Sequence, residues 1–98
     1  YKAAEIVADL ITIIDAAKLE MVATAKMLVP LIEDALLLLE AFPGLEKDYW
    51  VLESMRKWRD HLINLPPEQV LPPEDAKKLE FETVRWLNDF RGRLKTLK

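Results

Sequence analysis

Two side chains of the kinds that act as bases and nucleophiles each occur once in the 98 residues: His61 and Ser54. Helical metal sites use histidines four residues apart, but His61 has Lys57 and Leu65 at those spacings. Ser54 lies outside the Gly-x-Ser-x-Gly setting that exposes a catalytic serine on a sharp turn. Neither residue indicates hydrolytic or metal-assisted chemistry, and we expect His61 on a helix surface.

Carboxylate pairs are the other groups that could do acid–base chemistry or hold a metal ion. Glu33-Asp34 and Glu74-Asp75 fall on polar helix positions and at a helix start, where solvation explains them. The two glycines, Gly44 and Gly92, are too far apart for a phosphate-binding loop, and cysteine is absent. We therefore expect no enzyme, no cofactor and no metal site, and a reducing compartment.

The elements that must position these side chains are helical. Ala, Leu, Lys and Glu dominate the chain, and no segment alternates apolar and polar residues. Four amphipathic segments with short loops predict an all-α fold, an antiparallel four-helix bundle. We expect helices at residues 2–19, around 31–42, at 46–64 and from Pro73 onward. Residues 1–98 are expected to form one domain, and the start at Tyr1 suggests a fragment of a longer chain.

The join between the first two helices is ambiguous from periodicity alone. No strong helix breaker stands between Leu19 and Lys26. Proline is tolerated in the first turn of a helix but disfavoured in its interior. Either the second helix begins shortly before Pro30, or a kink lies there.

Each expected helix carries an apolar stripe at i, i+3, i+4 spacing, and these stripes are the candidate core. In the first helix the stripe is Ile6, Leu10, Ile13, Ile14, Ala17 and Met21. In the second it is Met27, Leu31, Ala35, Leu38 and Phe42, flanked by Leu28, Ile32 and Leu39. The third and fourth stripes are Val51, Met55, Trp58, Leu62, Leu65, and Ala76, Leu79, Thr83, Trp86, Leu87, Phe90, Leu94, Leu97.

The first helix is unusual on its opposite side, where Ala8, Thr12, Asp15 and Leu19 line up. The outer side of a helix is ordinarily rich in Lys and Glu, whereas this one carries small residues and a leucine. We expect a docking face, in which Ala8 and Thr12 permit close approach of a partner. Asp15 and Lys18 would supply directional contacts, and Leu19 an apolar anchor.

Large apolar residues also fall off the other stripes. Leu37 lies on the far side of the second helix, and Tyr49 and Trp50 lie away from the third stripe. Phe81 is about 160–200° from the inner line of the fourth helix, at about 100° per residue. A large aromatic in that position is costly unless something covers it, so we add Phe81 to the expected docking residues.

The charge balance limits the kinds of partner. The net charge is −3 and the isoelectric point about 5.2, which argues against nucleic-acid binding. No apolar run reaches the roughly 20 residues of a membrane span, and no signal peptide is visible. Basic residues gather only near the end, from Arg85 to Lys98, where they complement a helix dipole. We expect protein partners, with no nucleic acid and no direct membrane insertion.

The residues named above resemble the C-terminal domain of a subunit of ESCRT-I, the vacuolar protein sorting-associated protein 28 family. In the first helix the matching positions are Val7, Leu10, Ile11, Thr12, Ile13, Asp15, Lys18 and Leu19, with Ile14 for the usual Met. Further along, the matches are Ala23, Tyr49, Trp58, Leu62, Phe81, Glu82, Asn88, Phe90 and Leu94. Glu80, Thr83, Val84 and Leu87 depart from the family pattern, and at Val84 the family's acidic residue is lost.

The resemblance implies a four-helix bundle without catalytic activity that works as an adaptor. It implies docking of ESCRT-II and, in some members, ESCRT-III components during sorting of ubiquitinated cargo into multivesicular bodies. Other ESCRT-I subunits would bind through segments outside this sequence. The implied location is cytoplasmic and peripheral at endosomes, and the first helix is implied to end between residues 19 and 22. The alternative interpretation is an idealised or engineered bundle with no dedicated ligand, which would be favoured if Thr12 and Asp15 were buried.

Overall fold

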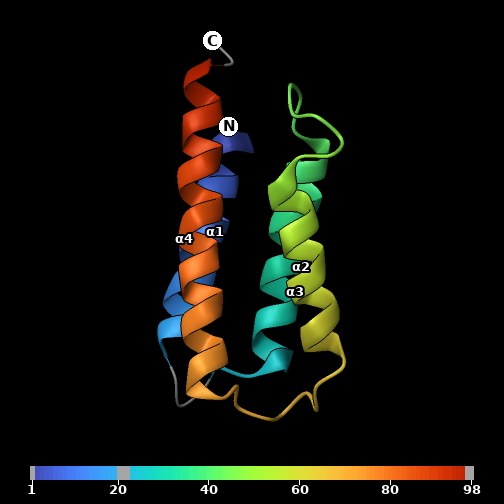
Figure 1. The fold of residues 1–98 in the computed structure, drawn as a ribbon, viewed down its shortest axis with the longest axis vertical. Coiled ribbons are helices and arrows are strands. Elements are labelled where there is room, and N and C mark those ends of the chain that lie inside the picture. Colours follow the sequence, from blue (N-terminus) through green and yellow to red (C-terminus); the bar gives the residue numbers. More distant parts are fainter. Residues whose placement is uncertain (1, 20–22, 97–98) are drawn as a thin grey trace.

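Four helices make up the computed structural model, which describes residues 2–19 and 23–96. They are α1 (Lys2–Lys18), α2 (Ala25–Ala41), α3 (Trp50–Ile63) and α4 (Pro73–Thr96). Successive helices run in opposite directions along a body of 42 × 21 × 20 Å (Figure 1). No strand occurs among the described residues, so the predicted all-α antiparallel bundle is confirmed. None of these helices is both long and apolar enough to cross a membrane.

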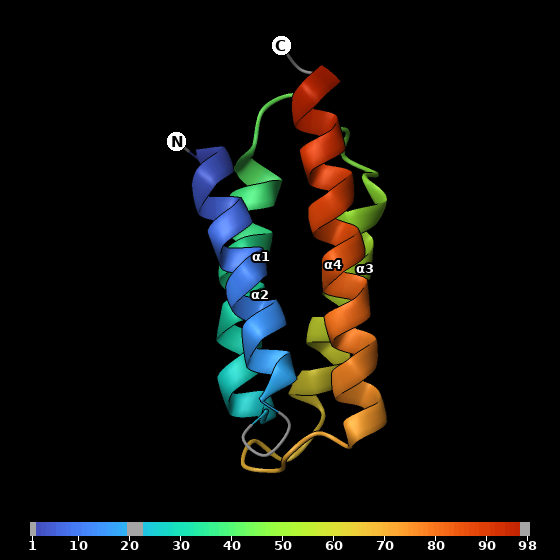
Figure 2. The same cartoon turned by 90° about the vertical axis from the view of Figure 1, so that its left-hand side faces the viewer.

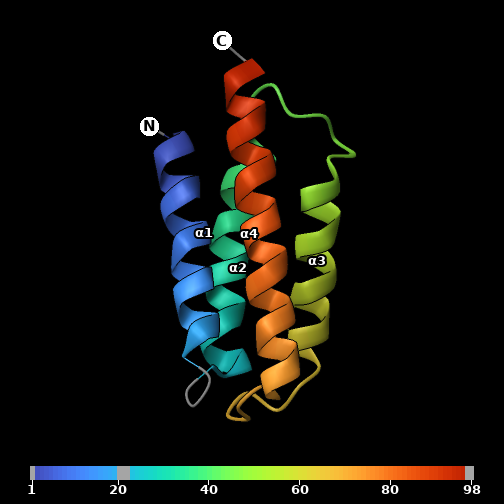
Figure 3. The same cartoon turned by 60° about the vertical axis from the view of Figure 1, so that its left-hand side comes forward.

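The helices follow one another around the bundle. α1 packs against α2 and α4, and α2 packs against α3, as the turned views also show (Figures 2 and 3). The fourth side is closed by side-chain contacts between α3 and α4, described below. The start of α1 and the end of α4 lie at the same end of the bundle (Figure 1).

The predicted stripes differ in how far they are buried. In α3, Val51, Met55 and Leu62 are buried as predicted, whereas Trp58 and Leu65 are half-buried. Every predicted inner residue of α1 and α4 that the structure describes is buried, except Leu94, which is half-buried. Met21 and Leu97 lie outside the described residues.

In α2 the predicted core stripe was wrong by one row of side chains. The residues that we expected to flank the stripe, Leu28, Ile32 and Leu39, are the buried ones. The α2 core is Ala25, Leu28, Ile32, Ala35, Leu36 and Leu39, whereas Met27, Leu31, Leu38 and Phe42 are half-buried.

The α2 boundary settles the ambiguity around Pro30. Thr24 caps the helix, because its Oγ1 accepts a hydrogen bond from the Met27 backbone N–H at 3.2 Å. Pro30 therefore lies in the second turn of a helix that starts well before it. α1 ends at Lys18, just before the implied range of residues 19–22, of which 20–22 are outside the described residues.

The start of α3 was predicted too early, at residue 46 rather than Trp50. Pro43-Gly44 turns the chain after α2, with Gly44 at φ 93°, a region that glycine adopts without strain. Tyr49 then takes an extended conformation (φ −54°, ψ 122°) and buries its ring, so it is not exposed as predicted. Trp50 is half-buried against the core.

The loops at the other end of the bundle are hydrogen-bonded to each other. The Leu71 backbone N–H donates to the Ala23 carbonyl at 2.8 Å, and that of Lys26 donates to the Pro67 carbonyl at 3.0 Å. In the α3–α4 linker Leu71 is buried, whereas Val70 is exposed. These bonds tie the α1–α2 connection to the α3–α4 linker.

Candidate functional site

The α1 outer face, which we define as Ala8, Thr12 and Asp15 together with Leu19 directly after the helix, is open to solvent. All four side chains are exposed, and Leu19 keeps 57% of its surface accessible although it is a large apolar residue. The opposite side of the same helix is buried at Ile6, Leu10 and Ile13. The docking face required exposure of Thr12 and Asp15, and the structure meets that requirement.

The polar groups of the α1 outer face differ in their availability. Thr12 Oγ1 donates to the Ala8 carbonyl one turn earlier, at 2.9 Å, so its hydroxyl proton is already used. Asp15 has no ion-pair partner among the described residues, and the same holds for Lys18 at the edge of the face. The face thus combines a small, smooth centre with two unpaired charges and one apolar end.

Phe81 is exposed as predicted, with 65% of its surface accessible, but it belongs to α4 and points away from that helix's buried line. No described contact joins it to the α1 residues, so it forms a separate feature. Ile11 and Val84 are also exposed, on the two helices that pack together. Sequence reasoning missed Ile11 as a surface residue, although its offset of about 100° from Leu10 is the signal that places it on the flank.

A polar cluster absent from the predictions lies between α3 and α4. Trp86, which is fully buried, donates from Nε1 to Ser54 Oγ at 2.9 Å, and Ser54 in turn donates to Glu82 Oε2 at 3.4 Å. The serine therefore gives the buried indole N–H an acceptor. Its partners are about 30 residues away in sequence (|i−j| of 32 and 28), so no local spacing signals this cluster.

A second group extends the same contact toward the α2–α3 loop. The Tyr49 hydroxyl donates to Asp89 Oδ2 at 2.6 Å, and Arg93 lies over the Tyr49 ring at 4.8 Å. Arg93 also pairs with Glu46 at 2.8 Å and with Asp89 at 3.6 Å. Burial of the ring, then the hydrogen bond to Asp89, raise the pKa of the Tyr49 hydroxyl above its usual range. We refer to these residues with Ser54, Glu82 and Trp86 as the α3–α4 polar seam.

His61 sits at the surface as predicted, with Nε2 3.9 Å from Asp75 and its ring edge against Trp58. Within the described residues, no three His, Asp or Glu side chains come close enough to hold a metal ion. Glu33 and Asp34 are exposed, and so is Glu74.

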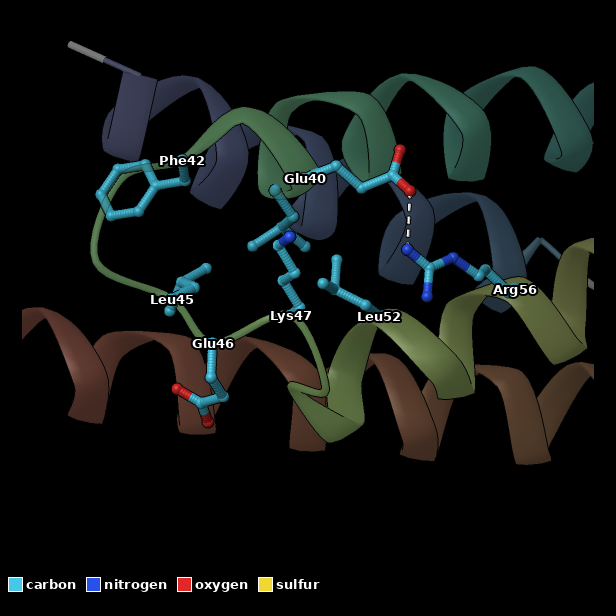
Figure 4. Close-up of a pocket in the computed structure, with 8 residues that line it drawn as sticks. Glu40, Phe42, Leu45, Glu46, Lys47, Leu52 and Arg56 are labelled. Atoms are coloured by element: carbon cyan, nitrogen blue, oxygen red, sulfur yellow. Dashed lines mark hydrogen bonds and ion pairs between the residues drawn. The ribbon is translucent and has the colours of Figure 1, made fainter.

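Three hollows lie on the described part of the bundle, and none of the three is lined by the α1 outer face. One, of about 270 Å³, lies between the end of α2 and the start of α3. Its apolar lining meets a charged rim, where Arg56 donates to Glu40 at 2.7 Å (Figure 4). A second, of about 260 Å³, lies between the start of α2 and the end of α3 and is lined mostly by apolar residues. The smallest of them, of about 150 Å³, lies beside Trp58 and His61. All three are smaller than the pockets that usually hold cofactors.

The geometry is that of a four-helix bundle, and comparison with known proteins agrees with the resemblance found in the sequence. The family model described as VPS28 protein matches residues 1–94. Neither the comparison with curated proteins nor that with solved structures gave a match. The family is a non-enzymatic subunit of ESCRT-I that takes part in endosomal protein sorting. Because the match covers nearly the whole sequence, the chain belongs to the VPS28 family, as its C-terminal domain.

Proposed function

We propose that this chain is a non-catalytic adaptor domain that docks ESCRT-II or ESCRT-III subunits through the α1 outer face. Lys18 would take part at the edge of the face, and Phe81 would act as a separate apolar contact on α4. The domain would be cytoplasmic, and these partners would recruit it to the surface of endosomes.

The observation that carries the proposal is the exposure of Leu19 directly after a helix that has small, exposed residues on one side and a buried opposite side. A leucine left in water gains free energy when a partner covers it. The alternative of a bundle without a ligand offers no reason for this composition. Burial of Thr12 and Asp15 would have favoured that alternative, and both are exposed.

The test replaces Thr12 and Asp15 with lysine and measures affinity for ESCRT-II subunits by isothermal titration calorimetry. Both positions are exposed, so we expect the bundle to remain folded and the affinity to fall by about tenfold or more, since long side chains block close approach. Circular dichroism checks the fold.

A matched control separates blocked docking from a change in net charge. Asp48→Lys with Asn88→Lys adds the same charge at two exposed positions outside the face. This control should bind like the unmodified chain. Equal affinity of both double variants would place docking elsewhere.

A further inference from the structure

The charges of the bundle are unevenly distributed. α1 and α2 together carry three lysines and six carboxylates, whereas α3 and α4 carry nine Lys or Arg and seven carboxylates. Of the six carboxylates on α1 and α2, only Glu40 has an ion-pair partner among the described residues. The lysine of α2, Lys26, is engaged by Glu68 of the α3–α4 linker at 3.1 Å.

Three of the unpaired carboxylates gather where α1 meets α2. Glu5 and Asp9 are one turn apart on α1, and Asp34 comes from α2. Burial first, then the charges of Asp34 and Glu5, raise the pKa of Asp9. The helix geometry agrees, because α1 and α2 pack together and run in opposite directions: Asp9 lies nine residues before the end of α1 and Asp34 nine residues after the start of α2, so the two are level. No described cation lies within ion-pair distance of the three carboxylates.

The same surface carries partly exposed apolar side chains. On α2, Met27 and Leu31 precede Asp34 by seven and three residues, and Leu38 follows it by four. These helical spacings place all of them on the same side of α2 as Asp34. All three are only half-buried. We call these three residues, together with Glu5, Asp9 and Asp34, the acidic seam.

The acidic seam adjoins the α1 outer face. Thr12 lies three residues after Asp9, which belongs to the acidic seam, and four residues after Ala8, which belongs to the α1 outer face. Thr12 is therefore next to residues of both surfaces. Asp15 adds a further unpaired carboxylate on the outer face itself. A partner that covers α1 therefore meets apolar and small side chains bordered by negative charge.

We infer that the acidic seam and the α1 outer face together bind a basic amphipathic helix of the partner, with Lys or Arg facing Glu5, Asp9 and Asp34. This inference rests on the proposed function and adds the chemistry of its partner. The partner's apolar side would cover Leu31 and Leu38, and its cations would relieve the repulsion among the carboxylates.

The test uses two labelled helical peptides of equal length with the same leucine stripe, one with lysine and one with glutamate on the polar side. Fluorescence anisotropy measures their binding to the chain. We expect the lysine peptide to bind and the glutamate peptide not to bind. Binding should weaken as NaCl rises from about 0.05 M to about 0.5 M, because salt screens exposed charges.

Asp9→Asn with Asp34→Asn should weaken binding of the lysine peptide about three- to tenfold, as expected when two exposed charge pairs are lost. Asp48→Asn with Glu74→Gln removes the same net charge from exposed carboxylates away from the seam, and should leave binding unchanged. Equal binding of both peptides, or equal losses in both double variants, would overturn the inference. A third outcome would also overturn the inference: the chain alone forms a dimer, and Asp9→Asn with Asp34→Asn abolishes that dimer. The occupant of the surface would then be a second copy of the chain.

Failure of this inference is distinguishable from failure of the proposed function. If Thr12→Lys with Asp15→Lys abolishes binding of an ESCRT-II subunit while Asp9→Asn with Asp34→Asn leaves it intact, docking stands and the basic partner does not. If both variants bind that subunit normally, the docking face itself is wrong.

Discussion

The acidic seam and the α3–α4 polar seam lie on opposite sides of one bundle and use their carboxylates differently. Asp89 and Glu82 accept hydrogen bonds from groups on α3 or the preceding loop, and Arg93 binds Asp89 and Glu46. Asp9 and Asp34, by contrast, have no partner among the described residues and repel each other. The α3–α4 polar seam therefore holds helices together, whereas the carboxylates of the acidic seam make no such bond among the described residues.

The largest expected effect breaks the α3–α4 polar seam at its buried centre. Trp86→Ala should lower the free energy of unfolding by about 3–5 kcal/mol, because it leaves a cavity and removes the donor to Ser54. Urea unfolding followed by circular dichroism measures it. If that variant does not fold, Trp86→Phe provides a milder change in the same direction.

The matched control for this prediction is the exposed aromatic of the same helix. Phe81→Ala should change the free energy of unfolding by less than about 0.5 kcal/mol, since that ring is mostly in solvent. A large loss at Phe81 would show that it supports the fold, and would remove it from the docking residues.

An intermediate effect is expected at Tyr49. Tyr49→Phe should cost about 1–2 kcal/mol near neutral pH, because Asp89 loses a charge-assisted hydrogen bond. The raised pKa of Tyr49 means that the folded chain keeps this proton while the unfolded chain releases it near its ordinary pKa of about 10. The hydroxyl's contribution is therefore fully present below about pH 10 and is lost as the pH rises further.

The pH dependence gives this prediction its own check. Urea unfolding of both proteins from neutral to strongly alkaline pH should show the advantage of the unmodified chain shrinking above about pH 10. A difference that stays constant across that range would mean that the hydroxyl does not titrate with folding.

The smallest expected effect is at Asp9 in the acidic seam, where a substitution should raise the free energy of unfolding instead of lowering it. Asp9→Asn should stabilise the bundle at neutral pH by no more than about 0.5 kcal/mol, because solvent still screens the repulsion at this half-buried site. Its raised pKa means that the native carboxyl binds its proton more tightly than the unfolded one. The gain from the substitution should therefore vanish below the ordinary pKa of about 3.9, where both states are protonated.

Asp89→Asn provides the counterpart in the other seam and should destabilise, because Asp89 accepts from Tyr49 and lies near Arg93. Differential scanning calorimetry at neutral pH and at about pH 3 compares the two variants. Destabilisation by both would mean that the acidic seam also supports the fold.

The features predictable from sequence were those set by local periodicity. The stripes of α1 and α4 repeat regularly enough to identify Leu10, Trp86 and Phe90 as core, and the exposed face of α1 is the complement of its stripe. α2 was harder, since its run of leucines allows two neighbouring rows to serve as the inner face. Packing on both α1 and α3 selected the row of Leu28, Ile32 and Leu39.

What could not be predicted depends on residues far apart in sequence. Tyr49 looked like a surface residue until Asp89, 40 positions later, gave its hydroxyl an acceptor. The unpaired state of Asp9 and Asp34 was equally hidden, because charge spacing within one helix says nothing about the neighbouring helix. Both seams therefore needed the three-dimensional arrangement, whereas the α1 outer face did not.

The shared end of α1 and α4 has a mechanical consequence. A force that pulls the two chain ends apart acts across the contact between these neighbouring antiparallel helices, and so peels them apart turn by turn instead of shearing them along their length. The hydrogen bonds of Leu71 to Ala23 and of Lys26 to Pro67 lie at the far end and would carry load only after the helices have separated. We therefore expect the bundle to unfold at low force, beginning at the end where α1 starts and α4 ends. The hydrogen-bonded connections at the opposite end should separate last.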